Sequence, residues 1–202
     1  MRGFFVTGTD TGVGKTFVTA AIARRARSLG RKVFAFKPIE TGCRGELGDD
    51  QAELCAAAGS WQEGELRGLY RLSRPVAPAV AAREAGIDIE IDRIAELART
   101  PADLTLVEGA GGWRVPISAT ADISDLAVRL GLPVLVVARA GLGTINHSLL
   151  TVEASNAAAL ILSVRPDDDL AFAHSNAEEI GRRWPGRIVV FQRDPSVLDP
   201  FT

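Results

Sequence analysis

The sequence has few of the residues and runs that mark a secreted, metal-binding or membrane protein. Its two cysteines, Cys43 and Cys55, give neither a disulfide framework nor the spacing of metal ligands. No apolar run approaches about 18 residues, so no segment is expected to span a membrane. The first apolar segment begins so close to Met1 that no room remains for a signal peptide. Together these absences predict a cytoplasmic protein.

A strong charge of either sign is also missing. With 23 basic and 25 acidic residues, the net charge is −2, which argues against an electrostatic grip on nucleic acid or on an acidic membrane. Lysine is scarce: only Lys15, Lys32 and Lys37 occur, and arginine supplies the other basic residues. Where arginine is the usual cation, a lysine can indicate a need for a compact ammonium group. The two histidines, His147 and His174, are isolated, and no Ser-His-Asp or Cys-His arrangement is visible.

Short apolar segments alternate with helical patterns along the 202 residues. The apolar segments predict strands at 4–6, 32–36, 104–107, 132–138, 158–164 and 187–191. Helical spacing and turn residues predict helices at 17–23, 50–58, 78–85, 91–99, 122–130, 146–154 and 170–183. Such alternation predicts an α/β fold with a mostly parallel sheet and helices on both faces. We expect residues 1–202 to form a single domain, with an irregular tail at 193–202.

The most informative segment runs from Gly8 to Thr16 and reads Gly-Thr-Asp-Thr-Gly-Val-Gly-Lys-Thr. It follows an apolar strand and opens a helix, which is the context of a phosphate-binding loop. Glycines let several backbone N–H groups point at one anion, and the helix N-terminus adds its positive end. Lys15 supplies a mobile charge for outer phosphates, and the Thr16 hydroxyl can ligate Mg²⁺. The pattern is imperfect, because Thr9 stands where a glycine is expected five residues before Gly14; an ordinary glycine-rich turn is the alternative.

Further candidates follow the other predicted strands, at the sheet edge where parallel sheets bind ligands. Lys37 ends the second strand and can stabilise charge on a transferred phosphoryl group or a substrate oxygen. Glu108 ends the third strand, where phosphate-loop enzymes place an acidic residue that holds Mg²⁺. Asp49 and Asp50 precede a helix, and either can cap it or complete a metal site with Thr16 and Glu108. For each residue, a solvated or capping side chain is the alternative.

Four segments resemble, in content and order, the dethiobiotin synthetase family. They are Gly8 to Thr16, Lys37-Pro38-Ile39-Glu40-Thr41-Gly42, Val107-Glu108-Gly109-Ala110-Gly111-Gly112-Trp113 and Gly141-Leu142-Gly143-Thr144-Ile145-Asn146-His147. The resemblance implies a P-loop NTPase-like fold, the substrates 7,8-diaminononanoate, CO₂ and ATP, and Mg²⁺ as cofactor. In this family one amine captures CO₂ as a carbamate, and ATP phosphorylates the carbamate. The second amine then attacks the mixed anhydride, expels phosphate and closes the ureido ring.

The resemblance also implies roles for individual residues. It assigns catalysis to Lys37, Lys15 and Thr11, and Mg²⁺ binding to Thr16, Asp50 and Glu108. The residues that it assigns to ATP are Gly12, Val13, Gly14, Lys15, Thr16, Phe17, Asp50, Glu108, Gly109, Ala110, Gly111 and Ser163. Those that it assigns to the diamine substrate are Thr41, Gly111, Gly112, Gly143, Thr144, Ile145 and Asn146. The last four belong to a turn that receives the substrate carboxylate across a dimer interface in the family, so a homodimer is expected.

Three positions depart from the family pattern. Gly12 stands where some relatives carry an acidic residue. Ser163 stands where the family usually has an asparagine that reads adenine, and residues 189–193 do not resemble the loop that covers the base. The phosphate chemistry is therefore better specified than the base, and nucleotide selectivity is expected to be relaxed.

Two other functions fit the pattern. One is another ATP-dependent amidoligase or cobyrinate-type synthetase of the same fold. The other is an ATP-driven partition or positioning switch. Such switches carry a second lysine near the start of the phosphate loop, where this chain has Thr9 and Asp10, and many use basic or amphipathic surfaces that are not visible here.

Overall fold

The computed structural model describes residues 2–202 and contains a six-stranded, wholly parallel sheet with the strand order β2-β5-β1-β6-β7-β8. Its strands are β1 (Gly3–Gly8), β2 (Val33–Phe36), β5 (Leu104–Gly112), β6 (Val134–Arg139), β7 (Ala159–Ser163) and β8 (Arg187–Phe191). The predicted α/β class with a parallel sheet is confirmed. A second, two-stranded parallel sheet of β3 (Ile39–Thr41) and β4 (Tyr70–Leu72) was not predicted, because three-residue strands are too short to give a periodic signal.

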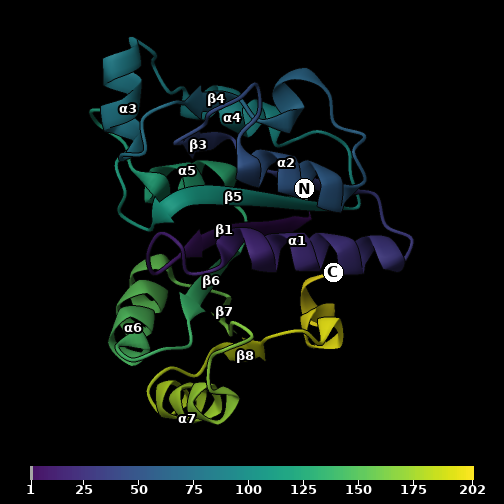
Figure 1. Cartoon of the computed structure of the whole chain (residues 1–202), viewed down its shortest axis with the longest axis vertical. Helices are drawn as coiled ribbons and strands as arrows, with labels where there is room; N and C mark the ends of the chain where they lie inside the picture. Colours follow the sequence, from purple (N-terminus) through teal and green to yellow (C-terminus); the bar gives the residue numbers. More distant parts are fainter. Residues whose placement is uncertain (1) are drawn as a thin grey trace.

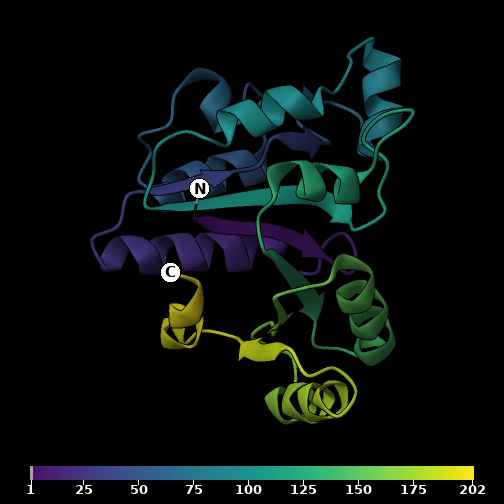
Figure 2. The same cartoon turned by 180° about the vertical axis from the view of Figure 1, so that it is seen from behind.

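Helices cover both faces of the main sheet (Figures 1 and 2). They are α1 (Lys15–Ser28), α2 (Asp49–Ala58), α3 (Pro78–Ala85), α4 (Ile91–Leu97), α5 (Ile123–Leu130), α6 (Thr144–Ser155) and α7 (Leu170–Gly181). Strand residues alternate between the two cores, as period-two geometry requires. Phe5 and Val107 face the core under α4 and α5, whereas Val6 and Leu106 face the core under α1. Except for the edge strand β8, which is mostly half-buried, the strands are therefore buried on both sides, which explains the continuous apolar runs.

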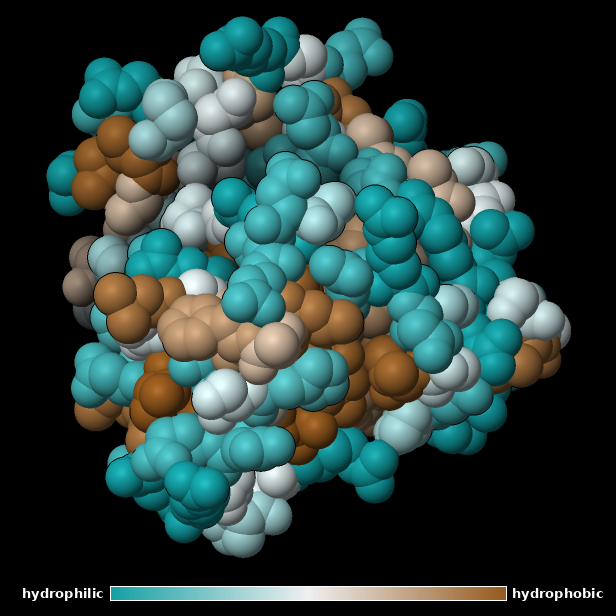
Figure 3. All heavy atoms as spheres, turned by 60° about the horizontal axis from the view of Figure 1, so that its bottom comes forward, coloured by the Kyte–Doolittle hydropathy of each residue, from teal (hydrophilic) through white to brown (hydrophobic). Residues whose placement is uncertain are grey.

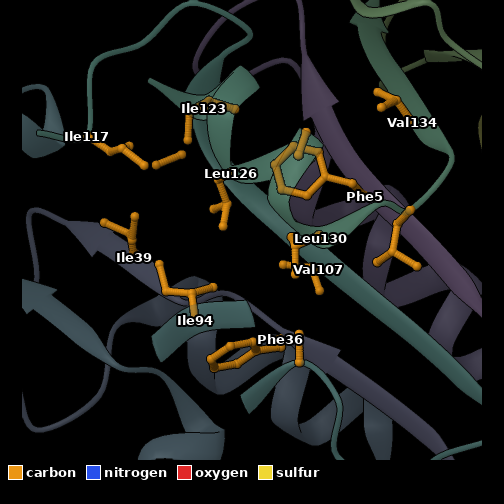
Figure 4. Packing of buried hydrophobic residues seen from close by; sticks show 14 of the residues in the cluster. Phe5, Phe36, Ile39, Ile94, Val107, Ile117, Ile123, Leu126, Leu130 and Val134 are labelled. Atoms are coloured by element: carbon orange, nitrogen blue, oxygen red, sulfur yellow. The ribbon is translucent and has the colours of Figure 1, made fainter. Parts of the chain in front are cut away.

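Figure 4 shows the first of these cores from close by. Phe5, Phe36 and Val107 reach from the sheet toward Ile123, Leu126 and Leu130 of α5 and Ile94 of α4, and Ile39 joins them from the small sheet. All of these side chains except Leu130 are at most 1% exposed. The small sheet and the main sheet thus share one core.

Helix ends follow the residues that the sequence placed there. The Asp122 carboxylate caps α5 by accepting from the backbone N–H groups of Ser124 and Asp125, and Gly131 ends the helix with a φ of 64°. Gly59 ends α2 with a φ of 99°. Positive φ angles suit glycine, which lacks the Cβ that makes them costly.

Two predicted boundaries are wrong. Strand β5 continues through Gly112, so Glu108 lies inside the strand rather than at its end. The reason is pairing with β1, which holds Val6 beside Glu108 and Gly8 beside Gly112. The predicted helix at 146–154 begins earlier, at Thr144, after the left-handed Gly143.

The predicted irregular tail at 193–202 is also wrong. Residues Pro195–Phe201 form a 3₁₀ helix, η2, which the Asp194 carboxylate caps at its start. Phe201 is buried and meets Phe4 edge to face at 5.8 Å, and Asp199 pairs with Arg25 of α1. These contacts are between residues far apart in sequence, so the local pattern carried no sign of them.

Apolar side chains are exposed at a few places. Figure 3 shows a band of them between hydrophilic residues on the end of the molecule that comes forward in that view. Among the most exposed are Leu142, at 85%, before α6, and Leu150, at 60%, on α6. Within residues 2–202, no helix has the length and apolar character needed to cross a membrane.

Candidate active site

The phosphate loop connects β1 to α1 at the carboxyl-end edge of the sheet, on the left in Figure 1. Its shape depends on glycine at two points. Gly12 and Gly14 have φ angles of 73° and 99°, in the left-handed region that other residues rarely adopt. A Cβ at Gly14 would also lie 2.3 Å from the Ser163 Oγ at the end of β7. Ser163 therefore packs directly behind the loop.

A cavity of ≈ 740 Å³ opens in front of this loop. Its walls come from the loop, the ends of β2 and β3, the start of α2, the segment before α3, and β5. The lining residues are Thr11, Gly12, Gly14, Lys15, Thr16, Phe17, Lys37, Glu40, Thr41, Gly42, Asp49, Asp50, Pro75, Val76, Ala77, Pro78, Ala110, Gly111 and Val115. One side of the cavity is thus charged, and the side formed by residues 75–78 and Val115 is apolar.

Four of the predicted residues meet at the charged side. The Lys37 Nζ donates to the Glu108 Oε1 at 2.9 Å and to the Asp50 carboxylate. The Thr16 hydroxyl donates to the same Glu108 oxygen at 2.8 Å. The structure therefore brings Thr16 of α1, Asp50 of α2 and Glu108 of β5 around the Lys37 ammonium. Of the two aspartates that the sequence left open, Asp50 is the one that pairs with Lys37.

The two lysines of the site respond differently to burial. Desolvation lowers the pKa of Lys37, but the carboxylates of Glu108 and Asp50 outweigh it, and the net pKa is raised above the ordinary value. Desolvation lowers the pKa of Lys15 to about 8; attraction to Glu108 opposes this shift, and repulsion from Lys37 adds to it. Lys37 is therefore a permanent cation held by two carboxylates. The Lys15 ammonium instead donates to the backbone oxygen of Asp10, at 2.9 Å.

The oxygen atoms at this side suit Mg²⁺. Thr16, Asp50 and Glu108 offer hydroxyl and carboxylate oxygens, the donors that this cation prefers. The Glu108 Oε2 is buried and has no hydrogen-bond partner among residues 2–202, which leaves it available to a cation. No cluster of three or more His, Cys, Asp or Glu side chains within residues 2–202 forms a metal cage. This agrees with the preference of Mg²⁺ for one or two carboxylates completed by phosphates and water.

The remaining predicted residues divide into three groups, the last of which is the turn at the start of α6. Thr11, Gly12, Phe17, Thr41, Ala110 and Gly111 line the cavity, as the predicted contacts require. Three others stand behind it. Val13 is buried in the core, a Cβ at Gly109 would meet Phe5 and Ile123, and Gly112 backs onto Gly8 and Thr9.

The predicted substrate-binding turn at the start of α6 lies outside the cavity lining. Asn146 is exposed, whereas Thr144 is 2% exposed and its hydroxyl lies 3.3 Å from that of Ser148. Gly143, Thr144, Ile145 and Asn146 are all absent from the lining of this one chain. The structure thus does not bring this turn to the charged groups within a single copy.

Two residues of the site had no role in the sequence prediction. Glu40 of β3 is 8% exposed and accepts hydrogen bonds from the first turn of α2. Arg165, just after β7, donates to the Gly12 backbone oxygen at 3.1 Å. Arg165 follows a predicted strand that ends at the binding edge, and this position is the signal that points to it. Glu40 lies in β3, which is too short to be predicted.

Comparisons with known proteins agree with this geometry. A family model described as an AAA domain matches residues 2–179. A curated relative from Anaeromyxobacter dehalogenans (strain 2CP-C), named ATP-dependent dethiobiotin synthetase BioD, is 43% identical; the alignment covers 100% of this chain and 91% of the relative. A relative of the same name from Aromatoleum aromaticum is 44% identical over 90% of this chain and 86% of its own length.

Solved structures share the fold at low identity. The signal recognition particle receptor FtsY from Elizabethkingia anophelis matches with a TM-score of 0.58 at 16% identity, over 98% of this chain and 61% of FtsY. The MinC:MinD cell division complex from Aquifex aeolicus matches with a TM-score of 0.55 at 16% identity, over 98% of this chain and 84% of that one. These likenesses confirm the P-loop NTPase-like fold and nothing further. The identity to the curated relatives, over nearly the whole of both chains, shows that this chain belongs to the ATP-dependent dethiobiotin synthetase family.

Proposed function

We propose that this chain converts 7,8-diaminononanoate, CO₂ and ATP into dethiobiotin, ADP and phosphate, as a cytoplasmic cyclo-ligase of biotin biosynthesis. The observation that carries the proposal is the convergence of Lys37, Asp50, Glu108 and Thr16 beside the phosphate loop. The full-length identity to enzymes of that name supports it.

The reaction has a Coulombic problem that the charged side of the cavity can solve. A carbamate and a triphosphate are both anionic, so bringing them together costs energy that increases as the dielectric falls. Mg²⁺, held by Thr16, Asp50 and Glu108, would neutralise phosphate charge when bound. Lys15 and Lys37 place two further cations along the same wall, and the N-terminus of α1 adds its partial positive charge. The protein thus contributes fixed charges rather than a nucleophile, because the two substrate amines make both attacks.

The apolar side of the cavity suits the hydrocarbon chain of the diamine. Pro75, Val76, Pro78 and Val115 line the same cavity as the charged groups. An aliphatic chain placed there would leave water and hold both amines toward Lys37 and Thr41. Thr41 and Gly111 then lie where the carbamate forms, and Thr11 lies beside the transferred phosphoryl group.

We further propose a homodimer in which the α6 turn of one copy completes the site of the other. The turn at Gly143–Asn146 begins a helix, and a helix N-terminus favours a carboxylate. Two facts support a contact between copies there: the turn is absent from the cavity lining of its own chain, and Leu142 and Leu150 are strongly exposed beside it.

Base selectivity is proposed to be weak. Ser163 has one short hydroxyl, and it packs behind Gly14. An asparagine amide can both donate to and accept from one base edge, whereas a hydroxyl reaches less far. The side-chain amide of Gln192, which follows β8, donates a hydrogen bond to the backbone oxygen of Arg165. ATP is the nucleotide of the family, but little in this region would reject another base.

The experiment that tests the function combines the purified chain with diaminononanoate, labelled bicarbonate, Mg²⁺ and ATP. Acid-stable label in a cyclic urea, formed together with ADP, is expected. ATP hydrolysis that responds to DNA or lipid but not to the diamine would favour a positioning switch. ADP formation that requires another acid and an amine, in place of the diamine and bicarbonate, would favour a related amidoligase.

A further inference from the structure

The first turn of α2 is capped by a side chain from another element. Its own N-cap residue is Gly48, which has no side chain. The Glu40 carboxylate takes that place: its Oε1 accepts from the Asp50 N–H at 3.0 Å, and its Oε2 accepts from the Gln51 N–H at 2.8 Å. These two N–H groups have no partner within the helix, so Glu40 alone satisfies them among the described residues.

The absence of a side chain at Gly48 leaves space for the Glu40 carboxylate. Its φ and ψ of −70° and 155° are ordinary extended angles, so the backbone does not require glycine there. A Cβ at Gly48 would, however, lie 2.2 Å from the Glu40 Cδ and from its Oε2. Glycine is therefore needed for the carboxylate to reach the helix.

The same turn is also tied to Lys37. The Gln51 Nε2 donates to the Lys37 backbone oxygen at 3.1 Å, and the Gln51 Oε1 accepts from the Gly48 N–H at 3.3 Å. Gln51 is fully buried. Glu40 thus fixes a turn that touches Lys37 through the Gln51 amide on one side and through the Asp50 carboxylate on the other.

Lys37 and Glu40 form their hydrogen bonds with different partners. Lys37 donates to Asp50 and Glu108, and no hydrogen bond joins it to Glu40 within residues 2–202. The Glu40 carboxylate is instead satisfied by two N–H groups at the positive end of a helix. Glu40 can therefore sit near the two other carboxylates without taking the ammonium from them.

We propose that Glu40 is a positioning residue for the reaction: it fixes the first turn of α2 so that the Asp50 carboxylate stays beside Lys37 and the nucleotide-bound Mg²⁺. The proposal rests on the proposed function, since it takes Asp50 as a ligand of that cation. It concerns the placement of Asp50 rather than any contact between Glu40 and substrate.

The first test measures the cap itself by amide hydrogen exchange in the whole chain without nucleotide. Glu40→Gln removes one of the two carboxylate acceptors and the charge, so exchange at Asp50 and Gln51 should quicken by roughly 2- to 30-fold, the range for the loss of a helix cap. Asp169→Ala is the control at another helix, because Asp169 caps α7 by accepting from Ala171 and Phe172, and alanine cannot replace that cap. It should quicken exchange in α7 and leave α2 unchanged. Unchanged exchange at Asp50 and Gln51 in the Glu40 variant overturns the proposal.

The second test measures the consequence for Mg²⁺ without catalysis. Calorimetry with an ATP analogue bridged by methylene between its β and γ phosphates, with and without MgCl₂, gives the gain in affinity due to the metal. Glu40→Gln should reduce that gain several-fold and leave metal-free binding unchanged. In an Asp50→Asn background, Glu40→Gln should have no further effect, since the residue acts through Asp50. An equal loss in both backgrounds contradicts the proposal.

A glycine pair checks the same idea without touching Glu40. Gly48→Ala displaces the carboxylate and should reproduce both effects of Glu40→Gln. Gly45→Ala is the control, because a Cβ there meets only the Leu47 backbone oxygen at 3.9 Å. Wild-type behaviour of Gly48→Ala overturns the proposal. Failure of the wild-type chain to form a cyclic urea would instead contradict the proposed function, and neither exchange nor calorimetry depends on that reaction.

Discussion

The charged side of the cavity and the ends of β7 and β8 differ in how many side-chain contacts hold them in place. At the side formed by α1, α2 and β5, the buried Lys37 ammonium donates to Asp50 and Glu108, Thr16 donates to the same Glu108 oxygen, and Glu40 caps the turn that carries Asp50. At the ends of β7 and β8, Ser163 only backs the loop, and exposed Arg165 contacts a backbone oxygen. This difference is the basis of our proposal that the chain recognises transferred charge more strictly than base identity.

The largest expected effect comes from removing the Lys37 ammonium from the charged side of the cavity. Lys37→Ala should lower kcat by roughly 10²–10³, about 3–4 kcal/mol, because it removes a preorganised charge that acts in the transition state. Lys37→Arg should also fail, since a planar guanidinium does not replace a compact ammonium at this buried position. Steady-state kinetics measure both, and nucleotide binding should fall less because Lys15 and the loop remain. Wild-type turnover in either variant would remove Lys37 from catalysis.

A second effect is expected across the proposed dimer. Asn146→Ala should raise the KM for the diamine by roughly tenfold or more, the cost of a hydrogen bond to a charged group, and leave the KM for ATP unchanged. Mixing this variant with Lys37→Ala tests the shared site. Half of the dimers then pair the two variants, and each such dimer has one intact site, so about a quarter of wild-type activity should return. Mixtures with no recovery, or a fully active monomer, would contradict the shared site.

The residues at the ends of β7 and β8 should discriminate little between nucleotide bases. The kcat/KM values for ATP, CTP and GTP are expected to lie within roughly tenfold of one another, about 1.4 kcal/mol. Initial rates at subsaturating nucleotide measure this. A hundredfold preference for ATP would show that other groups near β7 and β8 read the base.

The smallest effect is expected at Arg165. Arg165→Ala removes one exposed hydrogen bond to the Gly12 backbone and should weaken nucleotide binding by roughly 2- to 10-fold. The loss should be equal for the three nucleotides, because the contact steadies the loop rather than the base. Arg187→Ala is the matched control, because Arg187 is also an exposed arginine but lies at the start of β8, away from the phosphate loop. A loss confined to one nucleotide would make Arg165 a base-reading residue.

Most of the main sheet could be predicted because its strands are buried on both faces and therefore read as apolar runs. The helix ends at Gly59 and Gly131 could also be predicted, because each has a positive φ, which favours glycine. The sheet of β3 and β4 could not be predicted, because a strand of three residues is too short to show an alternating pattern of apolar residues. The 3₁₀ helix near Phe201 depends on α1 and on Phe4, which no local pattern includes.

The site was predictable to the extent that each residue lies in a recognisable segment. Thr16, Lys37 and Glu108 follow from the phosphate loop and from strands that end at one edge. Glu40 was missed because its role depends on the fold: nothing in the sequence indicates that a strand carboxylate, ten positions before Asp50, will cap the helix that carries it. Resemblance alone led to the turn at Asn146, and a single chain leaves that turn outside the cavity.

In the proposed function, the charged side of the cavity couples ATP cleavage to ring closure. The most direct measurement is the rate of ADP formation with Mg²⁺ and ATP, in the presence and absence of both diaminononanoate and bicarbonate. We predict slow ADP formation by the chain alone and much faster formation with both substrates, with one labelled cyclic urea formed for each ADP. Equal rates of ADP formation with and without the diamine would contradict the account.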